Sequence, residues 1–186
     1  MKLFGLLLLI FSLQLSCVSF AGEMDSNTIF VSTAVNNKAV KIKNMLEESL
    51  PPQTPVIYTI VPRGLVVSIE ESVFFQGNSI NIKKSGVPAL NAVISVLKTI
   101  GNNCTIESHT EGYDSSEGDF HSNWEISMAR ANSITDYIVY CGKISPDRLF
   151  ALGFGDMMPF KDNVSAATKG FDKRIDFVIF DYEEKR

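Results

Sequence analysis

The stretch from His121 to Tyr140 constrains the fold most, because it has the pattern of an amphipathic helix. Ser122 stands three residues before Glu125, which is the capping-box spacing at a helix N-terminus. An apolar stripe follows at intervals of three or four residues, as one buried helix face requires: Trp124, Met128, Ala131, Ile134 and Ile138. Such a helix needs a core against which to pack, so it predicts a layered domain rather than an extended chain.

A second stripe on the same predicted helix is polar and consists of Asn123, Ser127 and Arg130. An arginine beside an amide and a hydroxyl is a plausible anion site, because its planar fork matches a carboxylate in a bidentate manner. A solvated outer face has the same pattern. The helix alone leaves both interpretations open.

Composition narrows the class of partner. The chain has 186 residues and a formal net charge of −4. No basic run is present that could neutralise the phosphates of a nucleic acid, so nucleic acid is excluded as a main partner. The length suggests one domain with appendages.

The N-terminus predicts export. Lys2 precedes a short apolar run, and Ser19 and Ala21 are small residues at the positions expected before a cleavage site, so residues 1–21 are interpreted as a signal peptide. Lipidation of Cys17 is the alternative. A predicted helix over 34–49 and a proline-rich linker over 51–55 follow, so residues 22–55 form a second segment ahead of a domain at 56–186.

The remaining elements predict an α+β sandwich, a mixed sheet with helices packed on one face. Strands are expected at 56–61, 65–69, 104–111, 148–152 and 174–182, and helices at 85–100 and 122–140. A helix that returns antiparallel to its preceding strand would bring Cys141 near Cys104. In an oxidising compartment this favours a disulfide, with two buried free thiols as the alternative.

Three motifs in order resemble the OmpA-like, peptidoglycan-associating domain family. Residues 107–111 read E-S-H-T-E and are similar to the family's E-G-H-T-D strand. Residues 123–131 resemble its N-x-x-L-S-x-x-R-A helix, in wording closest to the MotB-type stator branch. Residues 148–163 resemble its R-L-x-x-x-G-Y-G-E-x-x-P-x-x-x-N segment. The resemblance covers about residues 56–182 and implies a βαβαββ sandwich.

The resemblance implies a protein that binds peptidoglycan non-covalently, uses no cofactor and catalyses nothing. The family's acid and arginine grip the ammonium and the carboxylate of diaminopimelate in the stem peptide. Carried onto this chain, these residues are Glu111 and Arg130, with Thr110 and Asn123 matching their neighbours. A zwitterion needs one anion and one cation at a fixed separation, which agrees with the chemistry of these side chains.

Two departures from the family pattern bear on that function. Glu111 stands where the family has Asp, which adds one methylene and one rotor to be ordered on binding. The family's closing G-R-x-x-N-R-R-V appears as Gly170 to Ile175, with Phe171 and Asp172 in place of Arg and Asn, while Arg174 is kept. Asp172 could supply the acid or repel the ligand's carboxylate.

Other functions fit the sequence less well. A zinc site built on Glu107, His109 and Glu111 lacks the ligand motifs that accompany such sites, and a hydrolase would need a nucleophile or an activated water. The serious alternative is a scaffold subunit of an outer-membrane secretion machine, similar to the OmpA-like subunit of type IVB (Dot/Icm) systems, with weakened or lost wall binding. Both functions place the protein in the bacterial periplasm, in association with the outer membrane. Membrane attachment is expected only in the alternative in which Cys17 carries a lipid anchor.

Overall fold

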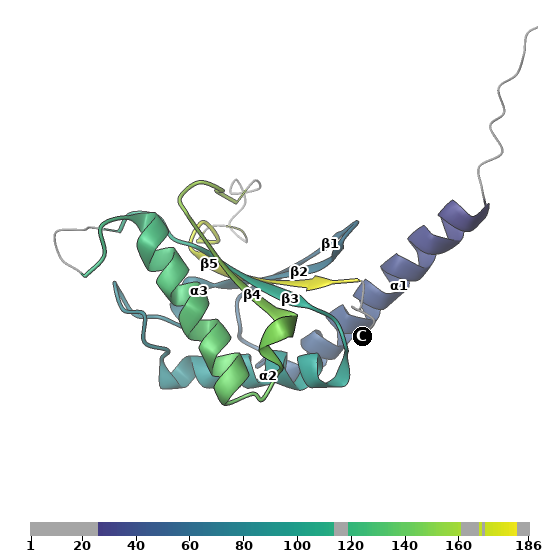
Figure 1. The fold of residues 1–186 in the computed structure, drawn as a ribbon, viewed down its shortest axis with the longest axis horizontal. Helices are drawn as coiled ribbons and strands as arrows, with labels where there is room; N and C mark the ends of the chain where they lie inside the picture. Colours follow the sequence, from purple (N-terminus) through teal and green to yellow (C-terminus); the bar gives the residue numbers. More distant parts are fainter. Residues whose placement is uncertain (1–25, 114–118, 161–167, 169, 182–186) are drawn as a thin grey trace, which may run out of the picture.

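The computed structural model describes residues 26–113, 119–160, 168 and 170–181, and these form a five-stranded sheet with helices on one face (Figure 1). The strands are β1 (Val56–Val61), β2 (Gly64–Glu70), β3 (Cys104–His109), β4 (Leu149–Gly155) and β5 (Arg174–Phe180). Their order in the sheet is β1-β2-β5-β3-β4. Only the β3–β4 pair is parallel among these strands, so the sheet is mixed, as predicted.

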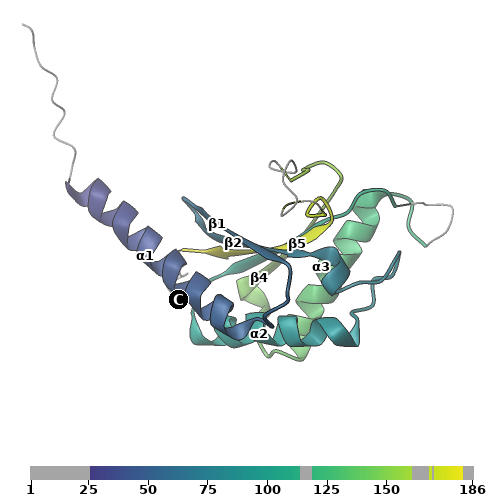
Figure 2. The same cartoon turned by 180° about the vertical axis from the view of Figure 1, so that it is seen from behind.

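The helices α2 (Val87–Thr99) and α3 (Asn123–Tyr140) cover the same face of the sheet (Figure 2). Alternate residues of the central strands point toward them because side chains alternate between the two faces of a strand. On β5, for example, Ile175, Phe177 and Ile179 enter the core while Arg174 and Asp176 lie on the opposite face. The opposite face therefore receives the polar residues of the central strands.

The helix α1 (Ser26–Ser49) begins earlier than the predicted residue 34 and packs on the domain through its C-terminal half. Ala39, Ile42 and Leu46 are buried in the same core as α2 and the sheet. Leu50 follows them into the core before Pro51 ends the pattern. The predicted signal peptide at 1–21 and Cys17 lie outside the described residues.

The start of α3 confirms the predicted cap. The Ser122 hydroxyl accepts a hydrogen bond from the Glu125 amide at 3.2 Å, and the Glu125 carboxylate accepts one from the His121 amide at 2.7 Å. The predicted faces of the helix are partly wrong. Trp124 is 52% exposed, whereas Ser127 and Arg130 of the polar stripe are buried.

The helix α3 and the strand β4 approach each other closely on the side of α3 that carries the buried polar residues. A Cβ on Gly153 would lie 2.4 Å from the Met128 amide nitrogen, so only glycine lets the strand come this near. At that contact Ser127 accepts a hydrogen bond from the Gly155 amide at 2.9 Å. The polar stripe thus faces the end of the sheet, and Trp124 is turned toward solvent.

The predicted disulfide between Cys104 and Cys141 is not formed, and both are free thiols. Cys104 begins β3 and points into the core, where burial raises the pKa of its thiol to about 12. Cys141 follows the last turn of α3 and is exposed. The topology does return the helix toward the start of the strand, but one side chain points into the core and the other toward solvent.

Candidate ligand-binding site

A cavity of about 700 Å³ lies where β3 ends, beside α3 and the turn that follows β2. Its lining contains four of the residues predicted for the site, Thr110, Glu111, Arg130 and Asp172. Gly170 and Lys173 of the closing motif line it as well. The lining also contains residues that no motif indicated: Glu70, Glu71, Ser72, Phe75, Gly77, Asn78, Gly112 and Tyr113. The predicted strand end and the predicted helix therefore meet at one cavity.

Arg130 forms the floor of this cavity and is only 1% exposed. Its Nη1 lies 2.7 Å from the Glu71 carboxylate and donates to Thr110 Oγ1 at 3.3 Å. Its Nε donates to the Ser79 carbonyl at 3.1 Å, and its Nη2 donates to the Gly77 carbonyl. The guanidinium is thus held by protein acceptors on several sides.

Glu71 is the acid that pairs with Arg130, and no motif indicated it. It begins the short 3-10 helix Glu71–Val73 directly after β2, is 8% exposed, and accepts a hydrogen bond from the Thr110 hydroxyl at 2.5 Å. Burial lowers the pKa of the Arg130 guanidinium, and the charge of Glu71 opposes that shift. The ring of Phe75, centred 5.1 Å from the Arg130 guanidinium carbon, adds a cation–π contact.

The exposed acid of the cavity is Glu111, the first residue after the buried Thr110. Asp172 lines the cavity too, and its carboxylate accepts a hydrogen bond from the Phe160 amide at 2.7 Å. Lys173 is exposed, and its ammonium lies 3.8 Å from where a Cβ on Gly112 would stand. An acid and an amine thus face the cavity from its rim.

Asn123 does not line the cavity. Its side-chain oxygen Oδ1 accepts a hydrogen bond from the Tyr113 backbone amide at 2.8 Å, and its side-chain Nδ2 donates to the Asp156 carboxylate at 3.1 Å. These bonds tie the start of α3 to the loops after β3 and β4. Asn123 therefore positions the Tyr113 backbone at the cavity edge and makes no direct contribution to the cavity surface.

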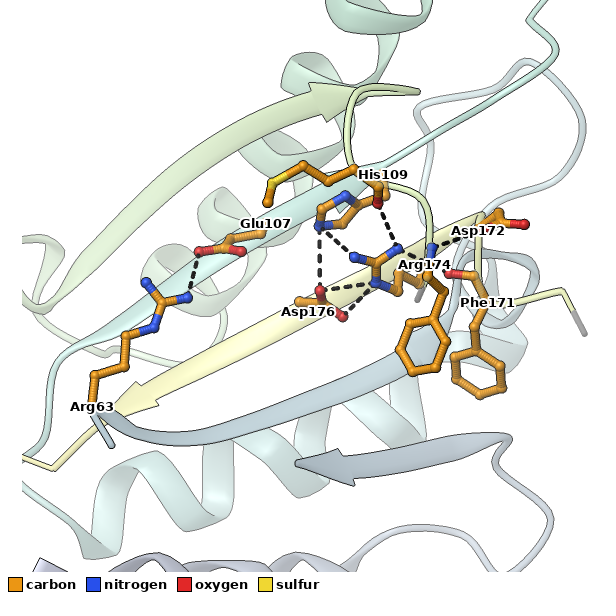
Figure 3. A network of polar contacts seen from close by, with 9 residues as sticks. Arg63, Glu107, His109, Phe171, Asp172, Arg174 and Asp176 are labelled. Carbon is orange, nitrogen blue, oxygen red and sulfur yellow. Dashed lines mark hydrogen bonds and ion pairs between the residues drawn. The ribbon is translucent and has the colours of Figure 1, made fainter. Parts of the chain in front are cut away.

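Arg174 also lies away from the cavity, in a buried network on the sheet face that carries no helix (Figure 3). Its Nε donates to both carboxylate oxygens of Asp176, at 3.2 and 2.9 Å. Its Nη1 donates to the carbonyls of Phe171 and Met158, so it anchors the segment that precedes β5. Arg174 is a structural link between the sheet and this segment.

The same network contains the three groups that could suggest a metal site, Glu107, His109 and Asp176. Their ligand atoms lie within 4.8 Å of one another, but Nη2 of Arg174 lies 3.3 Å from Nε2 of His109. A guanidinium at that distance places a fixed positive charge where a cation would bind. The cluster is better described as an internal network of charged groups. Glu111, the third ligand of the zinc site weighed from the sequence, is not part of it.

The two carboxyl groups of this network are shifted in opposite directions. Burial raises the pKa of Glu107, and the negative charge of Asp176 adds to that effect. Burial would also raise the pKa of Asp176, but hydrogen bonds from His109 and Ser68 and the charge of Arg174 outweigh it. The pKa of Asp176 therefore lies below its ordinary value.

The comparison with known protein families agrees with this site: residues 74–172 match the OmpA family. The match covers more than half of the chain, which therefore belongs to the OmpA family, a family of structural and non-enzymatic domains. Motility protein B of Bacillus subtilis is 30% identical over 118 residues, which are 62% of this chain and 45% of that protein.

Two solved structures share the fold. A MotB-like protein from Desulfovibrio vulgaris superposes with a TM-score of 0.72 at 18% identity, covering 86% of this chain and 99% of that one. The cell wall anchor of the T6SS from Pseudomonas aeruginosa gives a TM-score of 0.64 at 22% identity, covering 75% of this chain and 96% of that one.

The chain spans about half the length of the curated relatives it matches. None of the helices in the described residues has both the length and the apolar character that crossing a bilayer requires.

Proposed function

We propose that this protein binds the stem peptide of peptidoglycan non-covalently and thereby anchors an envelope protein or assembly to the bacterial cell wall. The observation that carries the proposal is an exposed acid, Glu111, at the rim of a cavity whose floor is the buried pair of Arg130 and Glu71. Membership of the OmpA family and the fold shared with a cell wall anchor support the same function. The proposed site of action is the periplasm.

In the proposed mechanism Glu111 faces the ammonium of the stem peptide, because it is the acid that extends from the end of β3 into solvent. Arg130 acts one step away from the ligand. It fixes Thr110 and the turn at Glu71, which give the cavity its shape. No covalent step is involved, and binding depends on charge and fit alone.

A scaffold role in an envelope machine is the second candidate function. It is supported by the likeness to a protein named for motility and to one named as an anchor of a secretion system. In Figure 1 the N-terminal half of α1 extends away from the domain and gives a partner an element to contact. This role and wall binding are compatible, because an anchored scaffold needs both contacts.

Co-sedimentation with purified diaminopimelate-containing sacculi tests the proposal. Glu111→Gln removes the charge at an exposed position and leaves the Arg130–Glu71 pair intact, so we expect binding to fall by about tenfold or more, the effect of losing a charge-assisted contact. Glu48→Gln, on the exposed face of α1, is the matched control and is expected to bind like the wild type. Equal retention of Glu111→Gln and wild type would refute wall binding through this cavity.

A further inference from the structure

The two outer strands of the sheet differ in how their free edges are protected. The helix α3 packs on β4 so closely that a Cβ on Gly153 would lie 2.4 Å from the Met128 amide nitrogen. In contrast, β1 pairs only with β2 among the described strands, and it contains neither a charged residue nor a proline (Figure 2). An unpaired edge without such residues is a template for a further strand. The edge of β1 is therefore open to pairing with another chain.

Alternate residues of β1 present their backbone hydrogen-bonding groups at this edge. The Pro55 carbonyl, directly before β1, accepts a hydrogen bond from the Glu70 amide at 3.3 Å and so points toward β2. Backbone groups alternate between the two sides of a strand, so those of Val56, Tyr58 and Ile60 point outward. A proline precedes β1 and another follows it, and neither donates a hydrogen bond. The prolines therefore confine a new pairing to the six residues of β1.

The side chains of β1 suit a second copy of the same strand. In an antiparallel pair related by a two-fold axis, one residue lies opposite its own counterpart, and we place Tyr58 at that axis. Val56 then lies opposite Ile60 of the second copy, and Ile60 is 39% exposed in the single chain. Ile57 lies opposite Thr59 in the same way. Each of these opposing pairs consists of β-branched residues, which pack well across neighbouring strands.

The charges of α1 agree with an axis at Tyr58. Lys43 and Glu47 are one helical turn apart, and Nζ of Lys43 lies 3.4 Å from Oε1 of Glu47. Nζ of Lys43 also lies 5.8 Å from the centre of the Tyr58 ring, and burial together with the charge of Glu47 raises the pKa of Tyr58 to about 12. A two-fold axis at Tyr58 reverses the direction of α1 in the second copy. Lys43 of each copy then lies toward Glu47 of the other, so the contact is complementary in charge.

We propose that this protein forms a homodimer in which the β1 strands of two copies pair antiparallel about a two-fold axis at Tyr58. The sheets of the two copies then join into one continuous sheet. Each β1 edge satisfies the other, so the contact closes on itself and does not propagate into a fibre. The dimer does not depend on the proposed function, but it would carry two cavities and so strengthen any attachment to a polymeric ligand.

Sedimentation equilibrium of the whole protein tests the proposal, with a reducing agent present to prevent a disulfide between copies through the exposed Cys141. We expect a reversible equilibrium between monomer and dimer. Ile60→Lys places a charge among apolar side chains of the second copy, so the dissociation constant should rise by about tenfold or more. Leu152→Lys is the matched control, because Leu152 is 41% exposed on the other outer strand, and it should dimerise like the wild type. A wild type that stays monomeric at about 1 mM, or equal weakening by the two variants, would overturn the proposal.

A charge exchange on α1 tests the position of the axis. Glu47→Lys brings lysines of the two copies toward each other, so the dissociation constant should rise by about fivefold or more, with a larger effect at low salt. Lys43→Glu combined with Glu47→Lys restores opposite charges across the axis, and the dissociation constant should return to within about threefold of the wild type. If the folded double variant dimerises no better than Glu47→Lys alone, the axis at Tyr58 is wrong.

Discussion

Arg130 and Arg174 both come from motifs shared with the OmpA family, and both are nearly inaccessible, with exposures of 1% and 7%. Arg130 lies under an open cavity and is paired with Glu71. Arg174 lies in a network with Asp176 and His109 and does not line that cavity. The comparison teaches that an arginine in a family motif can serve to hold the fold together. Its burial and its partners indicate whether it stabilises the structure or contacts a ligand.

The largest expected effect comes from removing the arginine under the cavity. Arg130→Met leaves Glu71 buried with only the Thr110 hydroxyl among these partners, so the free energy of unfolding should fall by about 3–5 kcal/mol. Urea denaturation measures it. Arg63→Met is the control, because Arg63 is exposed and lies 3.8 Å from Glu107, and it should cost no more than about 1 kcal/mol. Similar losses in both variants would contradict a structural role specific to Arg130.

Asp176→Asn tests the second network and should have a smaller effect, about 2 kcal/mol at neutral pH, the value of a charged hydrogen bond. The folded-state pKa of Asp176 is depressed, so its contribution is present above the unfolded pKa and is lost as pH falls through the folded value. The gap between wild type and variant should therefore begin to narrow below about pH 4 and vanish once the pH is below the folded-state pKa. A gap that persists in acid would show that the charge is not what stabilises the network.

Glu107→Gln should act in the opposite sense, because the folded-state pKa of Glu107 is raised. Its ionised form weakens the fold, and this cost is fully present once pH exceeds the folded value. The variant is therefore expected to be slightly more stable than wild type at neutral pH, with the difference vanishing below about pH 4. Urea titrations at several pH values measure the slope. Destabilisation at neutral pH would mean that the contact with Arg63 outweighs burial.

The smallest effect concerns the two cysteines, which repeat the contrast between a buried and an exposed group. In a Cys17→Ala background, one thiol should react with a thiol reagent in the native state, because Cys141 is exposed and Cys104 is buried with a pKa of about 12. Denaturation should release the second thiol. Two unreactive thiols that appear only after reduction would restore the disulfide predicted from the topology.

The order of the elements could be predicted because strands and helices have different periods of apolar residues. The parallel pairing of β3 with β4 and the central place of β5 depend on contacts distant in sequence, which periodicity does not record. The faces of α3 were misassigned at Trp124 for a related reason. Gly153 and Gly155 let β4 approach the backbone of α3 at Met128 and Trp124, and this contact joins segments distant in sequence.

The candidate site was predicted in part. The motifs correctly bring Thr110, Glu111 and Arg130 to one cavity, because a strand end and a following helix meet there. They missed Glu71, which reaches Arg130 only through the fold of the sheet. The adjacent acids Glu70 and Glu71 after a buried strand were the available signal, but a solvated turn has the same composition.

The position of β5 has a consequence for biosynthesis. Among the described strands β5 is synthesised last, yet it lies between β2 and β3 and pairs with both. Until it emerges, the nascent domain has two separate strand pairs with unprotected inner edges, which are prone to pair with other chains. The sheet therefore cannot be completed before β5 has emerged, and a truncation upstream of Arg174 would yield an aggregation-prone fragment instead of a smaller folded unit.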